Sequence, residues 1–184
     1  PSDDAGDPEL LLREQRHHEV VLVVAGRRDQ HLGGGIEKVS DASTPLKIAP
    51  ERYLVWSVDK VQGKPLATIG LHPNAAVMSF WGSARAAEYR KAMRALVALV
   101  RDLRHTYGDT LDIVVLGDLN YEDRADGRTW APRQVLRSLG LSWVNEGIDW
   151  VAFSDGLRVV SKNVIRPATN GQDHPWLEVE LERH

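Results

Sequence analysis

Two short polar side chains, Asp118 and Asn120, follow an apolar run and a glycine in residues 115–120 (Val-Leu-Gly-Asp-Leu-Asn). In extended backbone, residues two positions apart point to the same side. A carboxylate beside an amide could orient a water molecule or hold a phosphate oxygen. Gly, Asp and Asn are also common turn residues, so a simple strand-ending turn accounts for the pattern about equally well.

A second polar pair, Asp173 and His174, precedes the final segment of alternating apolar and acidic residues. Asp is a hard oxygen ligand of the kind that Mg²⁺ prefers. His is the usual proton-transfer residue, and a neighbouring carboxylate can set its tautomer. Taken alone, a polar turn before an edge strand is the simpler interpretation.

Two single residues are further candidates. His72 follows a predicted strand, and Asp149 lies among apolar residues at the start of another. A lone His at a strand end is more often structural than catalytic, and an Asp there could cap a turn. A buried Asp needs a partner, however, and a His nearby in space would supply one.

The elements that must position these residues follow from apolar periodicity and turn residues. A long helix is predicted over 83–105 and a short one over 131–139. Residues 27–35 are interpreted as a polar loop ending in three glycines, and residues 154–156 as the turn of a hairpin. Strands are predicted over residues 20–25, 36–40, 53–61, 66–69 (forming a hairpin with 53–61), 111–116, 150–153, 157–165 and 177–181.

This mixture of helices, strands and hairpins favours an α+β sandwich with mainly antiparallel sheets over a doubly wound parallel sheet. Residues 1–18 are predicted to be a flexible segment and residues 19–184 a single domain, which suits a chain of 184 residues. We find no internal repeat and no low-complexity segment.

Composition excludes several classes of function. The net charge is −3, so any binding of a polyanion must come from a local patch or from metal ions. The absence of cysteine excludes disulfides, thiolate metal sites and a cysteine nucleophile. No apolar run is long enough to span a bilayer and no signal peptide is visible, so we expect a cytoplasmic protein without membrane partners.

The order of the polar residues is more informative than any one of them. They fall at the ends of successive predicted strands, in the order His72, Asp118, Asn120, Asp149, Asp173 and His174. From about Val20 to the C-terminus, this series resembles the endonuclease/exonuclease/phosphatase (DNase I-like) family. That family carries Thr-His-Leu, Gly-Asp-x-Asn, Ile-Asp-Tyr and Ser-Asp-His motifs in the same order.

The resemblance implies a four-layer α/β-sandwich, in which two mainly antiparallel sheets are flanked by helices and the site lies at one end. It also implies a metal-dependent phosphodiesterase, in which water attacks the phosphodiester in line and Mg²⁺ or Mn²⁺ neutralises the phosphoryl oxygens. Asp173 would be a ligand of that metal ion.

The resemblance further implies a role for each of the other motif residues. His174 would act beside the scissile phosphate, and Asp149 would orient it. Asp118 would position or activate the attacking water, and Asn120 would hold a phosphate oxygen. His72 would stabilise the charge that develops on the phosphate.

The chain departs from the family pattern in three places. The motif around His72 reads Gly-Leu-His-Pro, and Gln172 replaces the Ser before Asp173. The family's opening, a strand with an Asn and a later strand ending in Gln-Glu, is not found. Aligning that later strand with residues 19–25 would put Val24 and Ala25 where Gln and Glu belong. We therefore interpret residues 20–25 as the family's next strand.

The missing opening has physical consequences. A single carboxylate would hold Mg²⁺ weakly, and the sheets would have exposed apolar edges. The missing strands could come from a further segment or from a second chain, or the protein could be a metal-poor relative.

Basic segments at residues 27–31 and 85–94 could meet a polyphosphate backbone, although the helical ones could equally form a solvated face. Tryptophans near strand ends could stack on bases, whereas core packing suits Trp150 better. The candidate substrate contacts are Arg27, Arg28, Asn74, Arg85, Tyr121 and Trp176. We predict a nuclease acting on DNA or RNA, with DNA favoured. The alternatives are a catalytically impaired binding or regulatory module and a small-molecule phosphatase.

Overall fold

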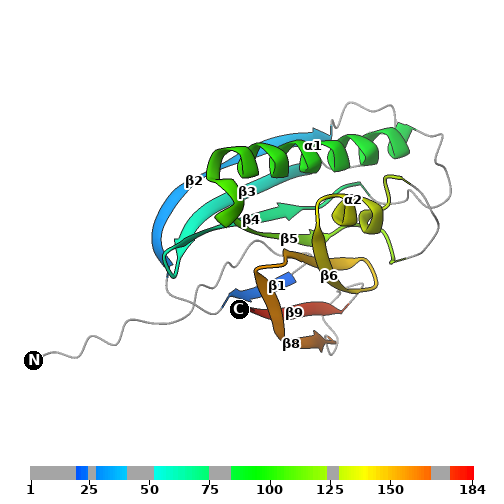
Figure 1. The fold of residues 1–184 in the computed structure, drawn as a ribbon. Helices are drawn as coiled ribbons and strands as arrows, with labels where there is room; N and C mark the ends of the chain where they lie inside the picture. The colour runs from blue at the N-terminus through cyan, green and yellow to red at the C-terminus, as the bar shows by residue number, and fades with distance from the viewer. Residues whose placement is uncertain (1–19, 25–27, 41–51, 75–83, 124–128, 167–174) are drawn as a thin grey trace, which may run out of the picture.

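The computed structural model describes residues 20–24, 28–40, 52–74, 84–123, 129–166 and 175–184. These residues form a six-stranded sheet, a three-stranded sheet and two α-helices (Figure 1). The α+β class and the two-sheet sandwich are therefore confirmed. Residues 1–18, predicted to be flexible, lie outside the described part of the chain.

The six-stranded sheet has the order β2-β3-β4-β5-β7-β6, and only the β4–β5 pair in it is parallel. The three-stranded sheet has the order β1-β9-β8, with β1 parallel to β9. The strands are β1 (Val20–Val24), β2 (Arg28–Ser40), β3 (Arg52–Val61), β4 (Lys64–Leu71), β5 (Asp112–Asp118), β6 (Leu141–Glu146), β7 (Asp149–Ser154), β8 (Leu157–Ile165) and β9 (Trp176–Arg183).

Helices α1 (Ala84–Tyr107) and α2 (Pro132–Ser138) cover one face of the six-stranded sheet, and the three-stranded sheet lies on the other (Figure 1). A short 3-10 helix, η1 (Gly108–Thr110), links α1 to β5. Tyr89, Met93, Leu96 and Val100 recur at helical spacing and are fully buried against the sheet. Neither described helix combines the length and apolarity needed to cross a membrane. The described layers are thus helix, sheet and sheet, without an outer fourth layer.

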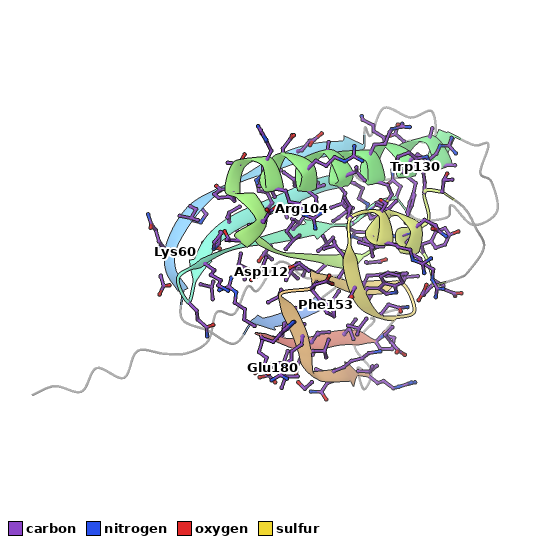
Figure 2. The ribbon with its side chains drawn as sticks, viewed as in Figure 1. Lys60, Arg104, Asp112, Trp130, Phe153 and Glu180 are labelled. Atoms are coloured by element: carbon purple, nitrogen blue, oxygen red, sulfur yellow. The ribbon has the colours of Figure 1, made fainter. Side chains whose placement is uncertain are left out.

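The second apolar core lies between the two sheets and includes Val114, Val151, Phe153 and Val179. Figure 2 shows Phe153 in this position. The three-stranded sheet contacts β5 and β7, whereas β2 and β3 carry exposed apolar side chains. Ile36 is 71% exposed and Tyr53 is 42% exposed.

The predicted β3–β4 hairpin is confirmed. Gln62 and Gly63 form its turn with φ angles of +50° and +78°. Positive φ at both central positions gives the turn a twist that matches that of the flanking strands.

Residues 27–35 were predicted to be a loop, and this prediction is wrong for the described residues 28–35. They form the first half of β2, which pairs with β3. A Cβ on Gly34 would lie 2.5 Å from the carbonyl oxygen of Trp56, and one on Gly35 would lie 2.5 Å from the Trp56 ring. The glycines here permit the close approach of two strands rather than marking a loop.

The predicted hairpin at residues 154–156 is also wrong. β7 pairs with β5 and β6, while β8 pairs with β9 in the other sheet. The chain crosses between the sheets at Asp155 and Gly156, where a Cβ on Gly156 would lie 2.2 Å from Oδ1 of Asp112. The strand β6, which was not predicted, takes the place beside β7 that β8 was expected to fill.

Candidate functional site

Strand directions bring three of the predicted residues to one end of the six-stranded sheet. The parallel strands β4 and β5 end at Leu71 and Asp118, so His72 follows immediately. The antiparallel strand β7 begins at Asp149, directly opposite Asp118 in the ladder. We refer to this end of the sandwich, with β4 and β5 finishing and β7 starting, as the site end.

Asp118 and Asp149 form a pair of buried carboxyl groups. They are 3% and 2% exposed, and directly opposed residues of antiparallel strands have Cβ atoms about 4.5–5.5 Å apart. Their strand neighbours Leu116 and Val151 belong to the core between the sheets, so both carboxyl groups lie on the same face. Two negative charges this close disfavour each other. Such an arrangement is more typical of functional sites than of structural cores.

His72 and Arg52 complete a line of polar groups across three neighbouring strands. Nε2 of His72 lies 3.5 Å from Oδ2 of Asp118, and Nη1 of Arg52 lies 3.0 Å from Nδ1 of His72. Burial lowers the pKa of Arg52, while the charge of Asp118 raises it. Sequence reasoning missed Arg52, because it belongs to no polar motif and reaches His72 only through the β3–β4 pairing.

Asn120 connects the segments that follow β4 and β5. Its backbone N–H donates to Oδ1 of Asp118 at 2.7 Å, and its Nδ2 donates to the carbonyl oxygen of Pro73 at 2.9 Å. Its φ of +50° lies in the left-handed region, which Asn tolerates better than most residues. Since an amide nitrogen carries two protons, one of them is not used by Pro73.

The strand β9 also begins at the site end. Its last residue, Arg183, donates to Oδ2 of Asp112 at 2.6 Å, so β9 finishes beside the start of β5 (Figure 1). Asp173 and His174 precede the first residue of β9 in sequence but lie outside the described residues.

Solved structures share the fold of this chain. An endonuclease/exonuclease/phosphatase from Beutenbergia cavernae matches with a TM-score of 0.55 at 15% identity, covering 80% of this chain and 44% of that one. A mannosyl-6-phosphatase from Bacteroides thetaiotaomicron matches with a TM-score of 0.58 at 13% identity, covering 83% of this chain and 66% of that one. D. rerio TDP2 complexed with a single strand DNA product matches with a TM-score of 0.53 at 12% identity, covering 80% of this chain and 66% of that one. The chain has the endonuclease/exonuclease/phosphatase fold.

This chain spans less than two thirds of the length of these three structures. No family model matches its sequence, and no curated protein sequence matches it either. The likeness therefore concerns the fold.

The direction of β1 bears on whether this strand could be the one that ends in Gln-Glu in the endonuclease/exonuclease/phosphatase pattern. Val20 pairs with Leu177 near the start of β9, and Val24 pairs with Leu181 near its end. β1 therefore runs away from the site end. A Gln-Glu motif placed at residues 24–25 would follow the wrong end of this strand, which supports the interpretation of residues 20–25 as a later strand of the pattern.

Two of the predicted substrate contacts lie elsewhere in the structure. Tyr121 is 1% exposed, and its ring packs 6.1 Å from that of Tyr89, so it is a core residue rather than a surface for substrate. Arg28 pairs with Val61, at the end of β3 opposite the site end. Leu54 and Val61 are separated by roughly 23 Å at about 3.3 Å per residue. The structure therefore does not bring Arg28 to the site.

Asn74 remains a candidate contact. It is 7% exposed and lies two residues after His72. Among the described residues, none donates a hydrogen bond to its buried Oδ1. Buried acceptors are normally satisfied by protein, water or ligand, and an amide oxygen suits a hydroxyl group or a cation better than a phosphate oxygen.

The side chains of the remaining predicted contacts lie outside the described part of the structure. Arg85 lies in the first turn of α1 and Trp176 is the first residue of β9, while Arg27 lies outside the described residues. Trp150, by contrast, is 1% exposed and donates through Nε1 to the carbonyl oxygen of Tyr121 at 2.7 Å. Its predicted core position is confirmed.

The described residues alone do not fit a divalent-metal site. Within the described ranges, no three His, Asp or Glu side chains come together as ligands. Both oxygens of Asp118 already face protein groups, namely the Asn120 N–H and the His72 ring. A metal ion would therefore depend on Asp173 or on oxygen atoms from the substrate.

Gly117 lies directly before Asp118 and allows the end of β5 to pack closely against Leu71 at the site end. Its φ is +142°, and a Cβ there would lie 2.1 Å from the carbonyl oxygen of Leu71. We expect Gly117→Ala to destabilise the fold by about 2–3 kcal/mol through strain and backbone overlap. Gly140→Ala is the matched control, because Gly140 has φ +65° with open space around it, and should cost only about 1 kcal/mol. Urea unfolding of both variants checks this, and equal losses would contradict it.

Hydrogen bonds to the side chain of Asp123 hold the segment after Asn120 in place. Nε of Arg133 donates to Oδ1 of Asp123 at 2.5 Å, and Nε1 of Trp143 donates to Oδ2 at 3.2 Å. The Arg133 hydrogen bond holds the pKa of Asp123 below its ordinary value, with a smaller contribution from Trp143. The folded state therefore favours the ionised carboxylate.

This lowered pKa predicts how stability depends on pH. The contribution of Asp123 is fully present above its unfolded pKa of about 3.9, and it is lost as the pH falls through the lower folded pKa. We expect the stability difference between wild type and Asp123→Asn to be constant from pH 7 to 5 and to shrink below about pH 4. Urea unfolding across this range measures it. A difference that grows toward acid pH would contradict the sign.

Proposed function

We propose that this protein is a phosphodiesterase, with a DNA phosphodiester as the first candidate substrate. The observation that carries the proposal is the opposed pair of buried carboxyl groups, Asp118 and Asp149, with His72 3.5 Å from the first of them. The fold supports the same choice, because its solved examples include a phosphatase and a protein that holds a DNA product.

In the proposed reaction, Asp118 accepts a proton from water as the water oxygen attacks phosphorus. The hydrogen bond from the Asn120 N–H holds Oδ1 of the Asp118 carboxylate, and the other oxygen, Oδ2, lies 3.5 Å from Nε2 of His72. The bond from phosphorus to the leaving oxygen then breaks, and that oxygen receives a proton. We propose His174 as the donor of that proton and Asp149 as the residue that orients His174.

The charge that builds up on the phosphoryl oxygens needs donors and cations. The second Nδ2 proton of Asn120 and the ring of His72 are the proposed donors. Hydrogen-bond donors that are already in place stabilise the charge that develops in a transition state. We also propose Mg²⁺ or Mn²⁺ as the cofactor, with Asp173 as a ligand; a bound cation neutralises negative charge on the phosphate.

The choice of substrate rests on two of the solved structures. The D. rerio TDP2 structure holds a single strand DNA product, whereas the Bacteroides protein is a mannosyl-6-phosphatase. We place DNA before RNA and before small phosphate esters. The net charge of −3 means that a nucleic acid would have to be held locally at the site rather than by the charge of the whole chain.

The test compares a diester, bis-p-nitrophenyl phosphate, with the monoester p-nitrophenyl phosphate, and then plasmid DNA with RNA. Each is measured with EDTA, with Mg²⁺ and with Mn²⁺. Cation-dependent diester cleavage supports the proposal, and release of phosphate from the monoester alone favours a small-molecule phosphatase. DNA binding by folded protein without cleavage under any of these conditions would favour the non-catalytic binding module instead.

A further inference from the structure

We propose that Arg52 is a positioning residue, which holds His72 as the neutral tautomer with its proton on Nε2. In this form the Nε2–H faces Asp118 and the phosphate that reacts beside it. The kinetic consequence rests on the proposed function, whereas the tautomer of His72 does not.

The argument begins with the chemistry of the two groups in contact. A guanidinium has five N–H donors and no acceptor. Since Nη1 of Arg52 lies 3.0 Å from Nδ1 of His72, Nδ1 has to accept and therefore carries a lone pair. A neutral imidazole bears its single proton on the other nitrogen, so the proton of His72 is on Nε2.

The second contact of the ring agrees with this assignment. Nε2 lies 3.5 Å from Oδ2 of Asp118, a carboxylate oxygen that can only accept when ionised. A proton on Nε2 points at an acceptor, whereas the other tautomer would set a lone pair against a carboxylate and an N–H against a guanidinium. Full protonation of the ring would break the Arg52 bond and put two cations in contact.

The surroundings keep these groups in place. Leu54 pairs with Leu71 across the β3–β4 ladder, so the start of β3 lies beside the residues that follow β4. The side chain of Asp118 is 1% exposed and that of His72 is 25% exposed. The ring therefore has a buried partner on one side and an accessible edge, which is what a residue that contacts a substrate needs.

This arrangement reverses the more common one. A carboxylate usually accepts from Nδ1–H of a functional His and favours the imidazolium. Here a cation occupies the Nδ1 side and favours the neutral ring. We infer that His72 supplies a hydrogen bond to the phosphate rather than a proton, and that the positive charge near Asp118 is the permanent charge of Arg52.

The experiment reads the His72 ring directly by long-range ¹H–¹⁵N NMR at pH 7, with the His72 signals assigned from their absence in His72→Gln. Wild type should show the Nε2–H tautomer. Arg52→Met removes the donor and the charge at similar length, and should give a mixture of tautomers or a protonated ring. Arg52→Lys keeps a cationic donor and should retain the wild-type pattern. Arg133→Met, which removes an arginine that pairs with Asp123, is the control and should leave His72 unchanged.

Kinetics of the same variants give the second readout. We expect Arg52→Met to lower kcat for the diester by about 10²-fold with little change in KM, and Arg52→Lys to recover much of that loss. An Nδ1–H tautomer in wild type, or an unchanged His72 ring in Arg52→Met, overturns the inference. A rise in KM with an unchanged ring also overturns it, since Arg52 would then bind substrate directly. The expected change of tautomer without any activity in wild type would overturn only the proposed function.

Discussion

Replacing Asp118 with asparagine is expected to lower kcat/KM for a phosphodiester by about 10³-fold or more, because the substitution removes the proposed proton acceptor and its charge. The change conserves shape. An asparagine Oδ1 could still accept the hydrogen bond from the Asn120 N–H, so the loop after β5 should keep its conformation. The loss would therefore report on chemistry rather than on folding.

The matched control for this prediction is Asp123→Asn. Asp123 lies on the same loop but pairs with Arg133, and its replacement should change kcat/KM by less than about threefold. Thermal melts accompany both variants. Asp118→Asn replaces one of two opposed buried carboxyl groups with a neutral amide of the same shape, so its Tm should fall by no more than a few degrees. An Asp118→Asn protein that keeps kcat/KM within tenfold of wild type would contradict the assignment of Asp118.

The accuracy of sequence-based prediction in this fold depends on how local each signal is. The long helix was predicted over 83–105 and is observed over 84–107, because its apolar spacing and its terminating Gly108 are both local. The turn at residues 154–156 was misinterpreted, since an Asp-Gly pair serves equally well in a hairpin and in a crossing between sheets. Only the partner of the next strand decides between them, and that partner is the distant β9.

The same distinction applies to the site. Because Asp118 and Asp149 follow or begin predicted strands, their place at one end of the sheets could be predicted, but their direct opposition in the β5–β7 ladder was not. Arg52 could not be predicted, because its contact with His72 depends on the register of β3 against β4. Tyr121 was misjudged because a tyrosine one residue beyond Asn120 can point either outward or into the core, and here it packs on Tyr89.

Arg183→Met is expected to destabilise the fold by about 3–5 kcal/mol, more than Gly117→Ala. The Arg183 guanidinium closes the end of the sandwich opposite the site. It pairs with Asp112 at 2.6 Å and donates to the carbonyl oxygens of Val61, Lys64 and Pro65 in the β3–β4 hairpin. One side chain of the three-stranded sheet thus binds two parts of the six-stranded sheet, at the position where Figure 2 labels Asp112.

Burial makes the loss of the Arg183–Asp112 ion pair costly for stability. The side chains of Arg183 and Asp112 are 11% and 12% exposed, so removal of the guanidinium leaves a carboxylate with little access to water. Ser154 Oγ would still donate to Oδ1 of Asp112 at 3.3 Å, but a hydroxyl cannot replace a cation. The carbonyl oxygens of Val61 and Pro65 lose a partly buried hydrogen bond at the same time, which adds to the cost, whereas the hydrogen bond to Lys64 is exposed to water.

The control for Arg183→Met lies on the neighbouring strand. Arg158 pairs with Glu182 across β8 and β9, with side chains 65% and 36% exposed, and Arg158→Met should cost less than about 1 kcal/mol because water screens this pair. Urea unfolding at pH 7 measures both variants. The double variant Arg183→Met/Asp112→Asn should lose less stability than the sum of the two single changes, because no buried charge remains unpaired. If Arg183→Met and Arg158→Met cost the same, Arg183 does not hold the two sheets together.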